Sequence, residues 1–270
     1  MPELPEVETI RRGLKEHILH KQIDHVEVFY PKMIIPDVKS IEGLSEQFII
    51  DIDRRGKYLI FIFSNETMIS HLRMEGKYFY YPKAHQVDKH THVVFYFKDG
   101  SELHYNDFRK FGRMQMSNFK YLDLPPLSEL GKEPFELTVD DLYPYFKGSN
   151  RYLKEVLLDQ HIILGLGNIY ANETCFMMGL HPKTRVKNLS KVKIQKLIDA
   201  SCDVLSRAIE QGGTTVHTFS ALGIDGRFQV ELKVHGHENE PCQVCGTKIK
   251  KIKVGGRGTY YCPKCQIKRK

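Results

Sequence analysis

The first residues of the chain hold groups that could carry covalent chemistry. The sequence begins Met-Pro-Glu-Leu-Pro-Glu, so Pro2 becomes the amino-terminal residue once the initiator methionine is removed. An α-amino group has a pKa near about 8, against about 10.4 for lysine, so more of it is a neutral nucleophile at pH 7. A secondary amine that attacks an aldehyde-like sugar carbon forms an iminium, which stays cationic at any pH. Glu3 could transfer the protons of such a reaction.

The same stretch also fits the start of a helix. Pro5 suits the first helical position, and the glutamates at 6 and 8 complement the helix dipole. That interpretation leaves Pro2 and Glu3 unexplained. Lys57, in the sequence Arg-Arg-Gly-Lys-Tyr-Leu, could supply a second base in the same cleft, or it could be a surface lysine at a strand start.

Four of the six cysteines form two Cys-x2-Cys pairs with sixteen residues between them. They are Cys242, Cys245, Cys262 and Cys265. This spacing is typical of a four-cysteine site for one structural Zn²⁺. Two disulfides are the alternative, but nothing in the sequence indicates an oxidising compartment. Cys175 and Cys202 lie in helical patterns and are expected to be buried thiols.

The residues between the two cysteine pairs predict a β-hairpin. Apolar residues alternate with lysines up to Gly255-Gly256, where the chain turns, and Arg257 follows at the tip. From Cys242 to the end there are seven lysines, two arginines and no acid, more positive charge than the net +7 of the whole chain. Such a basic hairpin suits a nucleic-acid backbone.

Composition places the chain among ordinary globular proteins. It has 270 residues, of which 41% are hydrophobic and 27% charged. No run approaches the roughly 18 apolar residues of a membrane span, and the start is too charged for a signal peptide. We expect a cytoplasmic protein without membrane contact.

The elements that must position these groups change in character along the chain. A helical pattern at 6–18 precedes eight β-rich runs that end near residue 117. These runs predict an antiparallel β-sandwich or barrel. A proline-rich stretch follows, and then helical patterns that include a long one ending at Gly212-Gly213.

The sequence therefore predicts an α+β protein in four parts. They are a β-sandwich domain with an N-terminal helix at 1–120, a linker at 121–136, a helical domain at 137–234, and a zinc-finger hairpin at 235–270.

Two further patterns are weaker. Gly165-x-Gly167 lacks the third glycine of a dinucleotide site, but backbone N–H groups there, with Asn168, could hold a phosphate at a helix start. His90-x-His92 lacks a third metal ligand, so a polar contact or a hydrogen-bonded core histidine is the better interpretation.

Taken together, the motifs resemble those of the bacterial formamidopyrimidine-DNA glycosylases, relatives of endonuclease VIII. The resemblance covers the whole chain and rests on PELPEVET, RRGKYL, HLRMEGK, NDFRKFGRM, LLDQHIILGLGNIYANE, EQGGTT and RGTYYCPKCQ. It implies a helix-two-turn-helix in the helical domain. It also implies a monomeric repair enzyme, on the nucleoid of a bacterial cytoplasm, that excises oxidised purines from damaged double-stranded DNA and then cuts the strand.

The resemblance also implies roles for individual residues. Pro2 would form the Schiff base at the sugar C1′, Glu3 would act as acid and base, Lys57 would serve β-elimination, and Arg257 would bind phosphate and assist the second elimination. Glu6 would be a carboxylate that supports these residues without contacting the substrate itself.

Other residues would contact the DNA. His71, His90, Arg109 and Asn168 would contact the backbone. Met74, Arg109 and Phe111 would fill the gap left by the flipped lesion. The loop FSALGIDGRF at 219–228 would cap the flipped base.

Two positions depart from the family pattern. A DNA-contacting lysine of some members falls at Asn150, with Arg151 adjacent, and the usual paired arginines read Arg109-Lys110. Two other functions remain open: a non-catalytic zinc-dependent DNA-binding protein, and an enzyme that prefers oxidised pyrimidines.

Overall fold

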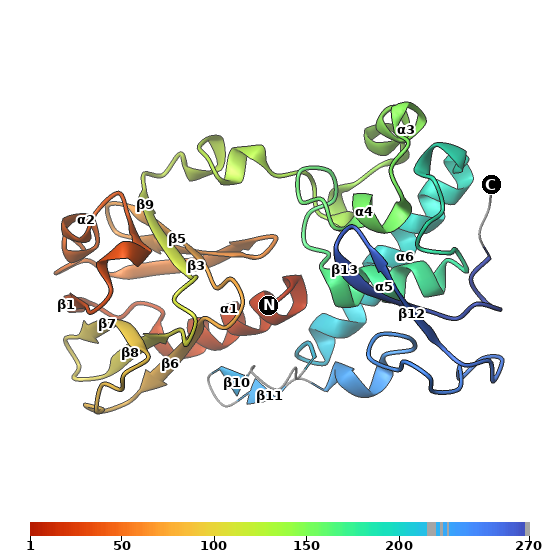
Figure 1. Cartoon of the computed structure of the whole chain (residues 1–270). Coiled ribbons are helices and arrows are strands. Elements are labelled where there is room, and N and C mark those ends of the chain that lie inside the picture. Colours follow the sequence, from red (N-terminus) through yellow and green to blue (C-terminus); the bar gives the residue numbers. More distant parts are fainter. Residues whose placement is uncertain (215–219, 222–223, 226, 268–270) are drawn as a thin grey trace. The chain divides into compact units, whose positions relative to one another are not determined.

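The chain folds into two compact units. The computed structural model describes residues 1–214, 220, 221, 224, 225 and 227–267. The first unit comprises Met1–Ser128 and Gln211–Arg227, and the second comprises Glu129–Glu210 and Phe228–Lys270. Figure 1 shows the β-rich first unit and the helical second unit with its hairpin. The α+β class predicted from the sequence is confirmed.

Two sheets build the first unit. The four-stranded sheet is antiparallel and has the order β1 (Ile23–Val28), β7 (Thr91–Phe97), β8 (Glu102–Asn106) and β6 (Lys77–Tyr81). The five-stranded sheet has the order β2 (Ile34–Ile35), β9 (Arg113–Ser117), β5 (Thr67–His71), β4 (Tyr58–Phe63) and β3 (Ile49–Arg55), and only β2 pairs in parallel. Both sheets contribute side chains to one buried apolar cluster, as a sandwich requires.

Helix α1 (Leu4–Ile18) completes this core. Its apolar positions Val7, Ile10 and Leu14 are fully or nearly fully buried in the cluster, at the helical spacing expected from the sequence. The helix begins one residue earlier than predicted: its first residue is Leu4, and Pro5 is its second. The earlier start places Glu3 at the helix cap.

The second unit is built mainly from helices. They are α3 (Val139–Gly148), α4 (Leu153–Leu157), α5 (Asn168–Met177) and α6 (Lys191–Glu210), followed by the hairpin strands β12 (Lys250–Val254) and β13 (Arg257–Tyr261). Cys175 is fully buried, as predicted. The prediction of a buried thiol was wrong for Cys202, which is only half-buried because it lies at the flank of the apolar stripe of α6.

Short elements connect the larger ones. The segment predicted to be a linker contains the 3-10 helices η2 (Tyr121–Asp123), η3 (Leu127–Glu129) and η4 (Pro134–Glu136). The other short elements are α2 (Val38–Glu42), η1 (Pro31–Met33), η5 (Val186–Asn188), η6 (Phe228–Glu231), β10 (Ser220–Ala221) and β11 (Ile224–Asp225). No helix among the described residues is long and apolar enough to cross a membrane.

Candidate active site and nucleic-acid interface

The amino end of the chain lies in a buried, charged environment. Pro2 is buried and Glu3 is 3% exposed, although Met1 itself is exposed. Burial lowers the pKa of the Met1 amino group below its usual value of 8.0. Charges on Glu3, Glu6 and Glu75 oppose this shift, and the charge on Lys57 adds to it. The start of the chain therefore lies among the carboxylates and the lysine proposed from the sequence.

Glu6 holds the start of α1 in place. Its Oε2 accepts a hydrogen bond of 2.9 Å from the backbone N–H of Glu3, and its Oε1 accepts one of 2.8 Å from the N–H of Thr214. Gly213 has φ +79°, and a Cβ atom there would lie 2.7 Å from Glu6 Oε1. One carboxylate thus connects the start of α1 to a residue 208 positions away in the sequence.

Lys57 is buried rather than on the surface. Its exposed fraction is 5%, and it lies in the tight turn between β3 and β4 next to Gly56, whose φ is +57°. The charge of Lys57 acts on the Met1 amino group and on His71. The interpretation of Lys57 as a surface lysine is therefore wrong, because the β3–β4 turn directs it inward.

His71, at the end of β5, is also buried. Burial, followed by the charges of Arg73 and Lys57, lowers the pKa of His71 to about 3. Its Nδ1 accepts a hydrogen bond of 2.9 Å from the backbone N–H of Arg73. At neutral pH the imidazole is therefore uncharged, with its remaining proton on Nε2.

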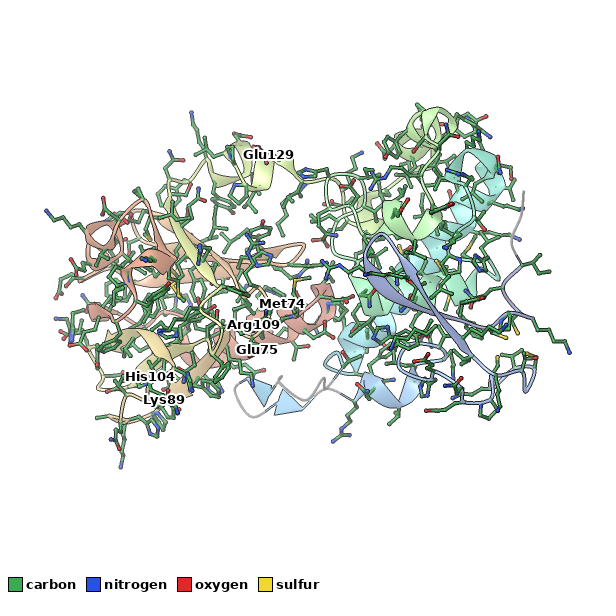
Figure 2. All side chains as sticks on the ribbon, in the orientation of Figure 1. Met74, Glu75, Lys89, His104, Arg109 and Glu129 are labelled. Atoms are coloured by element: carbon green, nitrogen blue, oxygen red, sulfur yellow. The ribbon has the colours of Figure 1, made fainter. Side chains whose placement is uncertain are left out.

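Two loops in the first unit carry the residues predicted to enter the DNA. Met74 lies in the loop after β5, and Arg109 lies in the loop after β8 (Figure 2). Phe111 lies in the same loop as Arg109. The Arg109 guanidinium lies 4.7 Å from the centre of the Phe111 ring, and both side chains are exposed. His90 is half-buried, with its ring 4.8 Å from that of Phe108. His92 is buried and its Nε2 hydrogen-bonds the Asp107 carbonyl at 2.8 Å, so it is a core histidine as expected.

In the second unit, the helix start and the hairpin lie side by side. Asn168 is the first residue of α5, and its Nδ2 donates a hydrogen bond of 3.1 Å to the carbonyl of Gly258 in β13. Arg257 begins β13 and is exposed. It lines a cavity of about 400 Å³ together with Arg151, Glu155, Asp159 and other residues.

The two candidates for the missing lysine contact differ in their surroundings. Asn150 is exposed, and its carbonyl accepts a hydrogen bond from Arg185. Arg151 donates hydrogen bonds of 2.7 Å to Asp159 and 2.9 Å to the hydroxyl of Tyr145. The guanidinium of Arg151 is therefore already engaged by a carboxylate.

A fully buried lysine connects the helices to the hairpin. Lys154 Nζ donates hydrogen bonds to Asn172 Oδ1 at 2.6 Å, to Thr259 Oγ1 at 2.8 Å and to the Gly258 carbonyl at 3.1 Å. Thr259 in turn bonds the carbonyl of Arg257. The ammonium group thus joins α4, α5 and the strand that carries Arg257.

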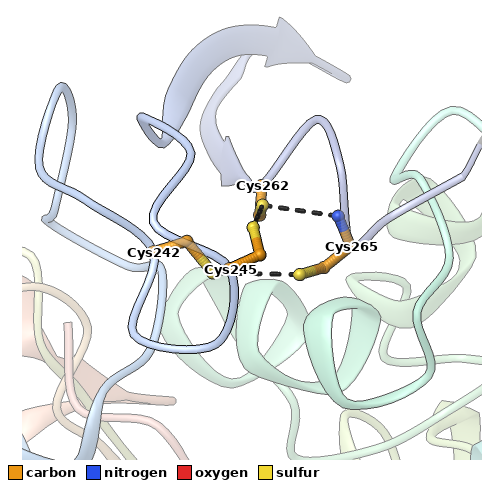
Figure 3. A group of neighbouring side chains, drawn as sticks. All are labelled: Cys242, Cys245, Cys262 and Cys265. Carbon is orange, nitrogen blue, oxygen red and sulfur yellow. Dashed lines mark hydrogen bonds between the residues drawn. The ribbon is translucent and has the colours of Figure 1, made fainter.

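The four cysteines of the hairpin meet at one point (Figure 3). Their Sγ atoms all lie within 4.8 Å of one another, and the Cys245–Cys262 and Cys242–Cys265 pairs are 3.4 Å and 3.9 Å apart. Four Zn–S bonds of about 2.3 Å in a tetrahedron place sulfurs at such separations. The distances are far too long for the roughly 2.05 Å of a disulfide. The donor set therefore fits the predicted zinc site.

Some functional candidates were not found from the sequence. Asp107 could have been suspected, because an aspartate before a basic, glycine-ended loop commonly bonds the loop backbone. Tyr105 and Lys154 carry no such signal. The strand pattern around Tyr105 and the helical pattern around Lys154 predict secondary structure, but neither pattern singles out one residue as functional. Of the loop at 219–228, which the resemblance predicts to cap the flipped base, residues 219, 222, 223 and 226 lie outside the described residues.

Comparison with known proteins agrees with this architecture. Residues 1–114 match the formamidopyrimidine-DNA glycosylase N-terminal domain, residues 130–220 match its H2TH domain, and residues 239–267 match the zinc finger found in FPG and IleRS. Together these matches define a DNA glycosylase architecture with a zinc finger.

Individual relatives point the same way. The formamidopyrimidine-DNA glycosylase of Exiguobacterium sibiricum is 48% identical over 98% of this chain and 99% of its own. Lactococcus lactis Fpg in complex with abasic-site DNA has a TM-score of 0.93 at 38% identity, covering 99% of this chain and 100% of that one. The same Fpg bound to N7-benzyl-Fapy-dG DNA gives the same values. The chain belongs to the formamidopyrimidine-DNA glycosylase family.

Proposed function

We propose that the protein is a base-excision DNA glycosylase with AP-lyase activity, which removes 8-oxoguanine and formamidopyrimidines from damaged double-stranded DNA. The observation that carries this proposal is the burial of Pro2, Glu3 and Lys57 at the amino end of the chain, where burial lowers the pKa of the Met1 amino group. We infer that the same surroundings act on the amino group of Pro2 once Met1 is removed. A lowered pKa leaves more of the amine neutral and nucleophilic at physiological pH.

The proposed reaction begins after Met1 is removed. The neutral nitrogen of Pro2 attacks C1′ of the damaged nucleotide, the bond to the base breaks, and the departing base takes up a proton. The nitrogen then gives up its proton, its lone pair breaks the C1′–O4′ bond, and O4′ takes up a proton as the sugar ring opens. The resulting iminium acidifies the C2′ proton. Glu3 serves proton transfer at the sugar, and Lys57 serves the β-elimination that expels the 3′ phosphate. Arg257 binds phosphate and assists the second elimination.

The DNA is held by neutral and cationic groups. His71, His90, Asn168 and Arg109 contact the backbone, and His71 does so as an uncharged hydrogen-bond donor because its pKa is about 3. Asn150 is the exposed member of the pair that replaces the missing lysine. Met74, Arg109 and Phe111 fill the space left by the flipped base. The Zn²⁺ bound by the four cysteines is structural and fixes the fold of the hairpin.

The remaining properties follow from this function. We assign the protein to the bacterial cytoplasm, on nucleoid DNA, as a monomer. Its four functional parts are the catalytic β-sandwich at 1–120, the linker at 121–136, the DNA-binding helices at 137–234 and the zinc-finger hairpin at 235–270.

Excision assays on defined duplexes test the function. We expect release of 8-oxoguanine with strand cleavage and only weak release of thymine glycol. Glu3→Gln removes the proposed proton-transfer group and should slow base release by about 10²- to 10⁴-fold. Glu16→Gln, an exposed change on the same helix, should leave the rate unchanged.

Two other outcomes would contradict the proposal. DNA binding without any base release would make the protein a non-catalytic DNA-binding protein. Faster release of thymine glycol than of 8-oxoguanine would assign it to oxidised pyrimidines.

A further inference from the structure

The two loops proposed to enter the DNA close on the same buried side chain. The first loop, Leu72–Gly76, carries Met74, and the second, Asp107–Gly112, carries Arg109 and Phe111. Figure 2 shows Met74 and Arg109 in the same part of the first unit. Tyr105, in β8, lies beneath both loops and is 0% exposed.

The glycines that end the two loops show how closely they approach Tyr105. A Cβ atom added to Gly76 would lie 2.1 Å from the Tyr105 hydroxyl oxygen, and one added to Gly112 would lie 1.8 Å from it. Both distances are far inside van der Waals contact, so only glycine fits at either position. The backbones of both loops therefore lie directly against the hydroxyl group of Tyr105.

Each loop is itself tightly held. The Asp107 carboxylate accepts hydrogen bonds from the backbone N–H groups of Arg109, Phe111 and Gly112 at 3.0, 2.9 and 2.7 Å. In the first loop, the N–H of Gly76 bonds the carbonyl of Leu72 at 3.0 Å. Hydrogen bonds therefore restrain the backbone of each loop.

The Tyr105 hydroxyl has no hydrogen-bond partner among the described residues. Burial raises the pKa of Tyr105 well above its usual value, so the hydroxyl keeps its proton at any working pH. A buried donor without an acceptor is destabilising, and phenylalanine would fill the same volume without that cost. The neighbouring Tyr78 differs, because its hydroxyl hydrogen-bonds Ser70 at 2.8 Å.

We propose that Tyr105 is a positioning residue that couples the two loops, and that its hydroxyl gains a backbone carbonyl acceptor when both loops insert into damaged DNA. Within the described part of the free protein this donor is unsatisfied, and insertion satisfies it. The coupling ensures that Met74 and the Arg109–Phe111 pair enter the duplex together. This inference rests on the proposed function.

Thermal unfolding of two conservative variants tests the first half of the proposal. Tyr105→Phe should unfold at the same temperature as the wild type or higher, because it removes an unsatisfied donor. Tyr78→Phe should unfold at a lower temperature, because it leaves Ser70 without its partner. Tyr78 is an equally buried control, and its ring lies 5.0 Å from that of Tyr105. A Tyr105→Phe protein that is less stable than the wild type would overturn the proposal.

Insertion into DNA tests the second half. A 2-aminopurine base beside an 8-oxoguanine reports unstacking by its fluorescence, followed by stopped flow. Tyr105→Phe should slow this step about fivefold, the factor that one hydrogen bond confers, whereas Tyr78→Phe should not change it. In the background of Met74→Ala the effect of Tyr105→Phe should shrink, because one of the coupled loops has lost its wedge.

The outcomes separate this inference from the proposed function. If the wild type gives no fluorescence change and no excision, the proposed function fails. If the wild type does both and Tyr105→Phe inserts at the wild-type rate, the function stands and the coupling is refuted.

Discussion

Glu8 is surrounded by three guanidinium groups on the inner face of α1. Its oxygens lie 2.7 Å from Arg11, 2.8 Å from Arg12 and 3.2 Å from Arg54. Burial by itself would raise the pKa of Glu8, but the hydrogen bonds from Arg11 and Arg12 outweigh it and lower the pKa to about 2. The charged form is therefore the one that the fold stabilises.

This pKa predicts acid sensitivity. A carboxylate with a lowered native pKa stabilises the fold above its unfolded pKa of 4.5, and that contribution disappears as the pH falls through about 2. Glu8→Gln should lower the free energy of unfolding by about 1–3 kcal/mol at pH 7. The difference from the wild type should shrink as the pH falls from 4.5 towards 2, as measured by urea unfolding at each pH.

Comparison between variants isolates the contribution of Glu8. His71 has a pKa lowered to about 3, so the unfolded chain binds its proton first and stability also falls with pH below 6.5. That decline should appear equally in the wild type and in Glu8→Gln. Glu16→Gln should follow the wild type throughout. A difference between Glu8→Gln and the wild type that stays constant from pH 7 to 2 would contradict the assignment.

At the residue scale, the sequence revealed groups whose chemistry shows in their type and spacing. The four cysteines could be predicted because zinc requires thiolates at that spacing, and Pro2 and Glu3 could be proposed because an amino terminus is distinctive. Lys154 and Tyr105 could not, because their importance comes from burial against distant segments. Lys154 bonds Thr259, 105 residues away, and no local pattern shows that contact.

At the scale of elements, Lys154 determines how the hairpin is attached to α4 and α5. Lys154→Met keeps the length of the side chain but leaves Asn172, Thr259 and the Gly258 carbonyl without the ammonium group. We expect a loss of about 2–4 kcal/mol in the stability of the second unit. Amide hydrogen exchange should accelerate in β13 while the protein retains its zinc.

A surface lysine of the same hairpin provides the control. Lys251 is exposed and pairs with Glu238 at 3.3 Å, so Lys251→Met removes the same charge without opening the interior. It should leave exchange in β13 unchanged. If amide exchange in β13 of the Lys154→Met protein were as slow as in the wild type, Lys154 would not be what holds the strand.

The elements themselves were largely predictable, and their ends were less so. The sandwich could be predicted from the β-rich runs separated by turn signals and from the apolar stripe of α1. The start of α1 was misplaced by one residue, because the Glu6 side chain caps the backbone of Glu3 and draws that residue into the cap. The half-exposed Cys202 was missed because periodicity gives the direction of a helix face but not its width.

At the scale of the whole molecule, the first unit is built from two separate stretches of chain. Residues Gln211–Arg227 join Met1–Ser128 across the entire helical region, and the bond from Thr214 to Glu6 spans 208 residues. Composition cannot reveal that the chain returns to the first unit, because neither stretch has an unusual composition of its own. The segment that contacts Glu6 near the amino end is therefore more than 200 residues away from it in the sequence.

The central claim is that the amino group of Pro2 is the nucleophile, and trapping with borohydride tests it most directly. The full-length protein is incubated with 8-oxoguanine duplex and sodium borohydride, then digested and analysed by mass spectrometry. We expect the DNA adduct on a peptide that begins with Pro2 and lacks Met1. An adduct on a lysine such as Lys57, or strand cleavage by a chain that retains Met1, would contradict the account.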